Sequence, residues 1–177
     1  MPVYLFTFHA YRSWLPDRRR GYVRRHEGIL PPDEELAEQY ARNAKHDEVK
    51  FDRATQEALI AETVTACKHQ KLQLHAVTTE PTHVHPLVTW RDTRPWLKVR
   101  TALKTSLTLR LKELTIDTKS HLAFSRSGSR KRVIDEDHLD YLLTRYLPAH
   151  TGAHWIDPTY IPLKQRPKKI AAGQRPR

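Results

Sequence analysis

Two histidines separated by one residue, His83 and His85, lie in the segment LHAVTTEPTHVHPLV. Side chains two residues apart on a strand point to the same face, so both imidazoles would project together while Val84 points away. Neighbouring imidazoles form half of a site for a divalent metal. A chain with 11 histidines in 177 residues contains about 0.7 such pairs by chance. The alternative is therefore two ordinary histidines on a half-exposed strand.

A tyrosine and a third imidazole follow far downstream, in the segment DYLLTRYLPAH. The residues Leu139, Leu142, Leu143 and Tyr146 fall at helical spacing i, i+3, i+4 and i+7, so they share one face of a helix. If that face packs on the sheet, Tyr146 points toward the histidine pair. His150 follows four residues later and becomes a candidate third metal ligand. The alternative is that Tyr146 is only the last core residue of an amphipathic helix.

Tyr141 is the competing tyrosine. It lies five residues before Tyr146, about 140° around a regular helix, and so faces elsewhere. Arg145 occupies the position four residues after Tyr141, where a ligand would be needed, but an arginine stays protonated and binds no metal. This comparison favours Tyr146 as the nucleophile and leaves Tyr141 as the alternative. Pro148 disfavours helical geometry at Leu147, so the helix is expected to kink or end there.

The charge distribution indicates a polyanionic partner. The formal net charge is +11, and the cations gather in two internal clusters and in the C-terminal segment. Several separated basic clusters are typical of proteins that bind nucleic-acid phosphates, although a solubilising surface is the alternative. The candidate nucleic-acid-binding residues are Arg18, Arg19, Arg20, Arg24, Arg25, Arg126, Arg130, Lys131 and Arg132.

The length of 177 residues and the overall composition predict a single soluble domain. We expect a domain over residues 1–160 and a basic, disordered tail over 161–177. No apolar run approaches the roughly 20 residues of a membrane span, and the N-terminal residues do not resemble a secretory signal. One cysteine, Cys67, excludes an internal disulfide and a multi-cysteine zinc site. We therefore expect a cytoplasmic, nucleoid-associated protein.

Hydrophobic periodicity predicts a mixed order of strands and helices. We expect strands over 3–11, 72–78 and 82–90, and a strand pair within 121–134 around Ser127-Gly128-Ser129. Helices are expected over 34–45 after an Asp33 cap, over 52–69, from a Thr93 cap to 114, and over 135–147. This order predicts an α+β sandwich, a mostly antiparallel sheet with helices packed against it.

The segments FTFHAYRSWLPDRRRGYV, LHAVTTEPTHVHPLV and DEDHLDYLLTRYLPAH, in this order, resemble the single-tyrosine HUH transposases. Within them the chain looks like the tyrosine transposases associated with repetitive extragenic palindromes. The resemblance spans most of residues 3–150. It implies a ferredoxin-like fold, a homodimer, and cutting and rejoining of single-stranded DNA beside small hairpins through a 5′-phosphotyrosine. It implies that His83 and His85 are the metal pair, Tyr146 the nucleophile and His150 the third ligand.

The sequence hypothesis is that the three histidines hold Mg²⁺ or Mn²⁺, which would polarise a phosphate oxygen while Tyr146 attacks. Trp14, Tyr22 or Trp90 would stack on unpaired bases, with core packing as the alternative for each. Two other functions stay open. One is a non-catalytic, domesticated nucleic-acid-binding protein, and the other is a metal-dependent nuclease that uses water.

Overall fold

A five-stranded antiparallel sheet forms the centre of the computed structural model, which describes residues 1–19, 21–24, 27–44, 46–114, 123–126 and 128–165. The strands lie in the order β6-β1-β5-β4-β7, and each neighbouring pair is antiparallel. Their bounds are β1 Val3–His9, β4 Gln73–Glu80, β5 His83–Thr89, β6 Ser129–Arg132 and β7 His154–Ile156. With helices α2 (Arg53–His69) and α3 (Trp96–Leu114), the chain order β1-α2-β4-β5-α3-β6 is the ferredoxin-like arrangement. The predicted α+β class is confirmed.

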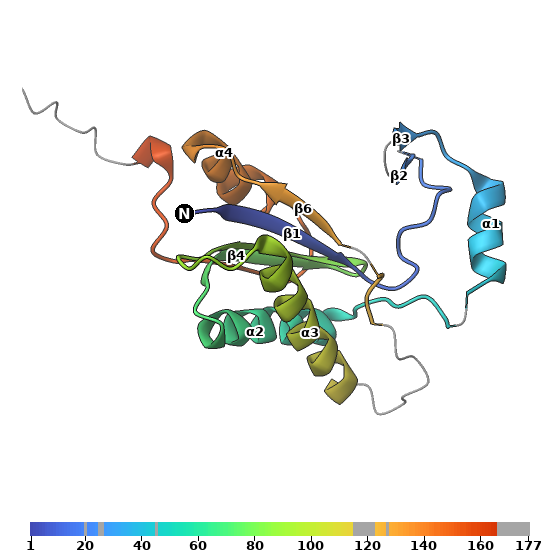
Figure 1. Ribbon diagram of the computed structural model, residues 1–177, viewed down its shortest axis with the longest axis horizontal. Helices are drawn as coiled ribbons and strands as arrows, with labels where there is room; N and C mark the ends of the chain where they lie inside the picture. Colours follow the sequence, from blue (N-terminus) through green and yellow to red (C-terminus); the bar gives the residue numbers. More distant parts are fainter. Residues whose placement is uncertain (20, 25–26, 45, 115–122, 127, 166–177) are drawn as a thin grey trace, which may run out of the picture.

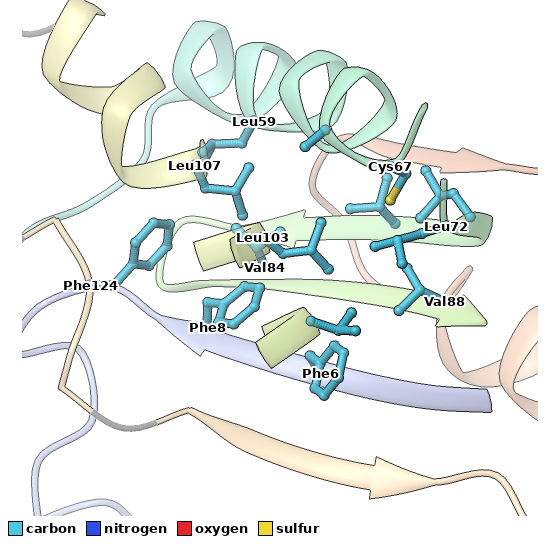
Figure 2. Packing of buried hydrophobic residues seen from close by; sticks show 14 of the residues in the cluster. Phe6, Phe8, Leu59, Cys67, Leu72, Val84, Val88, Leu103, Leu107 and Phe124 are labelled. Carbon is cyan, nitrogen blue, oxygen red and sulfur yellow. The ribbon is translucent and has the colours of Figure 1, made fainter. Parts of the chain in front are cut away.

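Helices α2 and α3 cover one face of the sheet, and helix α4 covers the other (Figure 1). Alternation of side chains along the strands produces the two faces. On β1 and β5 the residues Phe6, Phe8, Val84 and Val88 point to α2 and α3, where they pack around Leu59, Leu103 and Leu107 (Figure 2). The intervening residues therefore point to the α4 face, and these include both histidines of β5.

The helices begin where their caps allow. Asp52 accepts a hydrogen bond from the Thr55 backbone N–H, and α2 starts at the next residue, Arg53. The start of α3 differs from the prediction of a Thr93 cap. It begins at Trp96, and the Pro95 carbonyl accepts the N–H bonds of Lys98 and Val99. The proline disfavours helical geometry at the residue before it, Arg94, so the helix cannot start earlier.

The face opposite α2 and α3 carries a smaller core. Asp135 caps α4 (Glu136–Tyr141) by accepting from the His138 N–H, so the helix begins one residue later than the predicted range 135–147. A single π-helical turn, Leu142–Tyr146, continues α4 and closes with a bond from the Leu147 N–H to the Leu142 carbonyl. Three leucines of this segment, Leu142, Leu143 and Leu147, pack on Leu5, Ala76 and Leu87 of the sheet.

The predicted strand pair within 121–134 is wrong in its pairing. Strand β6 pairs with β1 rather than with the described residues 123–126, which make an isolated bridge from Phe124 to Ala10 and backbone hydrogen bonds to His9 and Tyr11. Gly128 makes this possible because a Cβ there would crowd the Thr7 carbonyl of β1. The predicted disordered tail, residues 161–177, lies mostly outside the described residues. Of residues 161–177, those up to 165 are described, and the Leu163 N–H donates to Asp140 of α4.

A small outlying unit lies between β1 and α2 in the chain. It contains a hairpin of β2 (Tyr22–Arg24) and β3 (Gly28–Leu30), followed by α1 (Glu34–Arg42), and it projects from one end of the sheet (Figure 1). Asp33 caps α1 as predicted, accepting from the Leu36 N–H. Among the described residues, no helix combines the length and apolarity needed to cross a bilayer.

Candidate metal and tyrosine site

Three histidines from two distant segments meet on the α4 face of the sheet. His83 and His85 come from β5, and His150 comes from the chain that follows the π turn. One ligand atom from each of the three lies within 4.8 Å of the other two. The imidazole ring centroids are 4.5 Å apart for His83 and His85, and 4.9 Å apart for His85 and His150. The structure therefore brings together the three side chains that the sequence indicates as metal ligands.

Each of these imidazoles has its Nδ1 atom occupied by a neighbour. His85 Nδ1 is 2.9 Å from the Thr7 hydroxyl, and His83 Nδ1 is 2.8 Å from the Thr82 hydroxyl. His150 Nδ1 is 3.0 Å from the Tyr146 carbonyl oxygen. A carbonyl oxygen only accepts, so His150 carries its proton on Nδ1 and has a free lone pair on Nε2. Such partners fix the ring orientation of metal-binding histidines.

The position of His150 follows from the segment that comes after it. The Thr151 N–H donates to Glu80 at the end of β4, at 2.7 Å, and the Thr79 N–H donates to the Ala153 carbonyl at 2.8 Å. Buried Gln56 of α2 accepts hydrogen bonds from the Thr79 hydroxyl and the Ala153 N–H. Gly152 lies against this network, where a side chain would collide with the Thr79 carbonyl. Residues 151–153 are thus fixed to β4, and His150 with them.

Tyr146 lies beside the histidines and Tyr141 does not. The Tyr146 ring centroid is 5.1 Å from His150 and 5.9 Å from His85, and the side chain is half-buried. Burial, with a smaller contribution from Tyr141, raises the pKa of the Tyr146 phenol above its ordinary value. Tyr141 is 53% exposed on the outer side of α4. Of the two tyrosines, Tyr146 is therefore the one that lies next to the histidines.

The histidine pair is held in its neutral form. Burial, together with the neighbouring imidazoles, lowers the pKa of His83 to about 4 and that of His85 to about 3. At neutral pH both rings are therefore uncharged, which is the form that binds a metal. The donor set of three imidazole nitrogens suits a borderline divalent cation, and a cluster of this kind leaves coordination positions open for oxygen. The residues present thus fit a divalent metal.

A fourth histidine, His9, extends the cluster and was not indicated by the sequence. It ends β1 and pairs in register with His83, with ring centroids 5.8 Å apart. Its other neighbour is Trp14, whose ring centroid is 4.5 Å away. Burial and the charge of Arg18 lower the pKa of His9 to about 4. Alternation along β1 places His9 on the same face as Leu5 and Thr7, but only the pairing of β1 with β5 reveals its neighbours.

The candidate nucleic-acid-binding residues divide between different surfaces. Arg18 and Arg19 are exposed in the loop after β1, and Arg24 on β2 pairs with Glu27 at 3.4 Å. On β6 the exposed side chains alternate, so that Lys131 shares the face of Leu5 while Arg130 and Arg132 share the face of α3. Arg126 lines a groove beside α3, which contains about 380 Å³ of space. Arg20 and Arg25 lie outside the described residues.

The aromatic residues considered for base stacking differ in their exposure to solvent. Trp90 is buried, stacks on Tyr4 and donates its indole N–H to the Arg94 carbonyl, so it is a core residue. Trp14 is 42% exposed next to the histidine cluster.

Comparisons with known proteins bear on the fold. A protein of Deinococcus radiodurans R1, provisionally described as a transposase, matches 86% of this chain and 92% of its own, with a TM-score of 0.51 and 13% identity. The REP-associated tyrosine transposase bound to a REP hairpin matches over 80% of this chain and 64% of its own, with a TM-score of 0.43 and 12% identity. No family model and no curated protein sequence matches the chain. At these identities the first likeness shows a shared fold.

Proposed function

We propose that this protein is a single-tyrosine HUH transposase that cleaves and rejoins single-stranded DNA through a 5′-phosphotyrosine. The observation that carries the proposal is the position of Tyr146, with its ring 5.1 Å from His150 and 5.9 Å from His85. A phenol next to three imidazoles combines a nucleophile with a metal site. The resemblance of the sequence motifs to this family supports the same assignment.

The proposed chemistry uses the residues in distinct roles. A divalent cation held by His83, His85 and His150 would polarise a non-bridging oxygen of the scissile phosphate. The Tyr146 oxygen attacks phosphorus in line, its proton passes to solvent water, and the bond from phosphorus to the 3′-oxygen breaks. The 3′-oxygen takes up a proton, and the 5′-phosphate remains on the tyrosine. Because the phosphotyrosine keeps the energy of the broken bond, a 3′-hydroxyl can attack it and rejoin the strand without ATP.

Burial gives Tyr146 a higher pKa than a free tyrosine, so the phenol is fully protonated at neutral pH. Its activation therefore depends on positive charge near the oxygen at the moment of attack. The His83 and His85 imidazoles are neutral and contribute none by themselves. For this reason we propose that the activity requires the metal. Imidazole ligands favour Mn²⁺ over Mg²⁺, which prefers oxygen ligands.

The proposed substrate is single-stranded DNA with a hairpin, and the exposed basic residues of the β1 loop and β6 would contact its phosphates. The family resemblance also leads us to propose a homodimer that acts on nucleoid DNA in the cytoplasm. Sedimentation velocity on the purified chain tests the dimer, because a monomer over the working concentration range would contradict it.

Covalent capture tests the function. Labelled single-stranded DNA from the flanks of the gene, hairpins included, is incubated with protein and Mn²⁺ and then denatured. The expected result is a denaturant-resistant adduct with wild type that is absent from Tyr146→Phe and His83→Ala and present with Tyr141→Phe. Loss in Tyr141→Phe but not in Tyr146→Phe would assign the nucleophile to Tyr141.

Two further outcomes identify the alternative functions. Cleavage that persists in Tyr146→Phe without an adduct would indicate a nuclease that uses water. DNA binding without cleavage or adduct, unaffected by removal of both His83 and Tyr146, would indicate a binding protein.

A further inference from the structure

The loop after β1 places an exposed aromatic ring and a cation beside the histidine cluster. Trp14 is 42% exposed, and its ring lies 4.5 Å from that of His9. The Arg18 guanidinium lies over the same indole, 3.8 Å from the ring centroid. His9 in turn neighbours His83. A single imidazole ring therefore separates the Trp14 indole from a candidate metal ligand.

This part of the loop is anchored to the site. The Ser13 hydroxyl is 2.9 Å from both the Ala10 and the Thr82 carbonyl oxygens, and the Ala10 N–H donates to the Thr82 carbonyl at 2.8 Å. Thr82 directly precedes His83. Pro16 is buried, and its carbonyl accepts from the Asp33 N–H, which fixes the loop at its other end. The position of Trp14 next to the histidines is therefore determined by backbone contacts on both sides.

The exposed side chains of Trp14 and Arg18 can each bind a further group. Arg18 is exposed and makes no ion pair with any acid in the described part of the chain. A guanidinium has five N–H donors in a planar fork that fits a phosphate, and an exposed indole face is a surface on which a base stacks. A cation over an exposed ring is held weakly, so it can turn to a phosphate when one arrives.

We propose that Trp14 and Arg18 form a nucleotide-binding subsite for single-stranded DNA next to the proposed cleavage position, with Trp14 stacking on an unpaired base and Arg18 binding the adjoining phosphate. The inference rests on the proposed function in placing that nucleotide beside the scissile phosphate. His9 supports the subsite, because it spaces the indole from the His83 imidazole. An unpaired base is required, since a base within a duplex has no free face for the indole.

Binding measured without cleavage tests the subsite. Fluorescence anisotropy follows a labelled single-stranded oligonucleotide from the gene's flanks with the Tyr146→Phe chain, in a chelator and over a series of salt concentrations. In this background Trp14→Leu is expected to weaken binding about tenfold or more, and Trp14→Phe to retain most of it. Arg18→Gln is expected to reduce the slope of log K against log salt by about 0.7, the value for one phosphate contact on a single strand.

Arg19→Gln is the matched control, because Arg19 is the neighbouring exposed arginine and its substitution removes the same charge, whereas Arg18 is the residue that lies over the indole. It is expected to weaken binding less than Arg18→Gln. A blunt duplex of the same sequence is the control for stacking, and Trp14→Leu is expected to leave its binding unchanged. Circular dichroism melting checks that each variant is folded.

The subsite would be overturned if Trp14→Leu and Arg18→Gln bound the oligonucleotide as tightly as the Tyr146→Phe chain without a loop substitution. Equal effects of the Arg18 and Arg19 variants would also overturn it, and so would the absence of any single-strand binding. Covalent capture with wild type separates the two ideas. Adducts combined with unchanged binding by the loop variants would contradict the subsite and retain the function. Weakened binding by the variants without any adduct would retain the subsite and contradict the function.

Discussion

The Thr7 hydroxyl is expected to control how tightly the histidine cluster binds a metal. Thr7 is buried on β1 and lies 2.9 Å from His85 Nδ1. Thr7→Val keeps the shape of the side chain and removes the partner that fixes the His85 ring. Loss of such a partner of a metal-binding histidine typically weakens metal binding 10- to 100-fold. We therefore expect the Kd for Mn²⁺ to rise by that factor, or about 1.4 to 2.8 kcal/mol.

The same substitution removes one hydrogen-bond partner of the buried His85 ring and leaves the Phe6 backbone as the other, which costs about 0.5–1.5 kcal/mol of folding free energy in the metal-free protein. For a chain of this length, each kcal/mol corresponds to about 2–4 °C in Tm. Isothermal titration calorimetry with Mn²⁺ measures the first effect, and thermal melting in a chelator measures the second.

Thr78→Val supplies the matched control. Thr78 pairs with His85 from the other side, on β4, and is fully buried, but its hydroxyl has no hydrogen-bond partner among the described residues. Removing an unpaired buried hydroxyl is expected to leave metal binding unchanged and Tm equal or higher. If Thr7→Val binds Mn²⁺ as tightly as wild type, or if Thr78→Val weakens binding as much, the assigned role of the Thr7 hydrogen bond is wrong.

Three further predictions concern stability and reactivity. Gly152→Ala places a methyl group against the Thr79 carbonyl, so we expect a loss of about 1–3 kcal/mol in urea unfolding together with weaker metal binding; unchanged values would contradict the proposed anchoring. Burial raises the pKa of the Cys67 thiol to about 12, so a thiol reagent at pH 8 should label it only after denaturation. For the metal-free protein, His83 and His85 have folded pKa values of about 4 and 3 against 6.5 when unfolded. The unfolded chain therefore takes up protons first, and the free energy of unfolding should fall as the pH drops from about 6.5 to 4, whereas a rise over that range would contradict the burial of these rings.

Much of the fold could be predicted because local signals were strong and agreed with one another. The Asp33 cap and the apolar spacing of α2 and α3 each specify an element from neighbouring residues alone. The pairing of β6 with β1 could not be predicted in this way. It joins residues more than a hundred positions apart, and the local Ser-Gly-Ser signal is equally typical of a hairpin turn.

In the candidate site too, some residues could be placed from local patterns, whereas others depend on contacts between distant segments. Helical spacing placed Tyr146 on the sheet side, and strand alternation placed His83 and His85 together. The approach of His150 depends on Gly152, Gln56 and the end of β4, contacts that no local pattern contains. His9 and Thr7 belong to the cluster only because β1 lies beside β5. Within β1 alone they read as alternate residues of an apolar strand.

The π turn before the candidate site has an evolutionary consequence. It brings Leu142 and Leu147, five residues apart, into one core, although a regular helix would turn them about 140° away from each other. A π turn is equivalent to one residue added to an α-helix, and such turns are less favourable than the helix they interrupt. A lineage that deleted one residue here would bring the two leucines to a spacing of four, on one face of a regular helix, so their packing does not require the extra residue. Persistence of this turn in an active relative would therefore record selection for reactivity at the expense of stability.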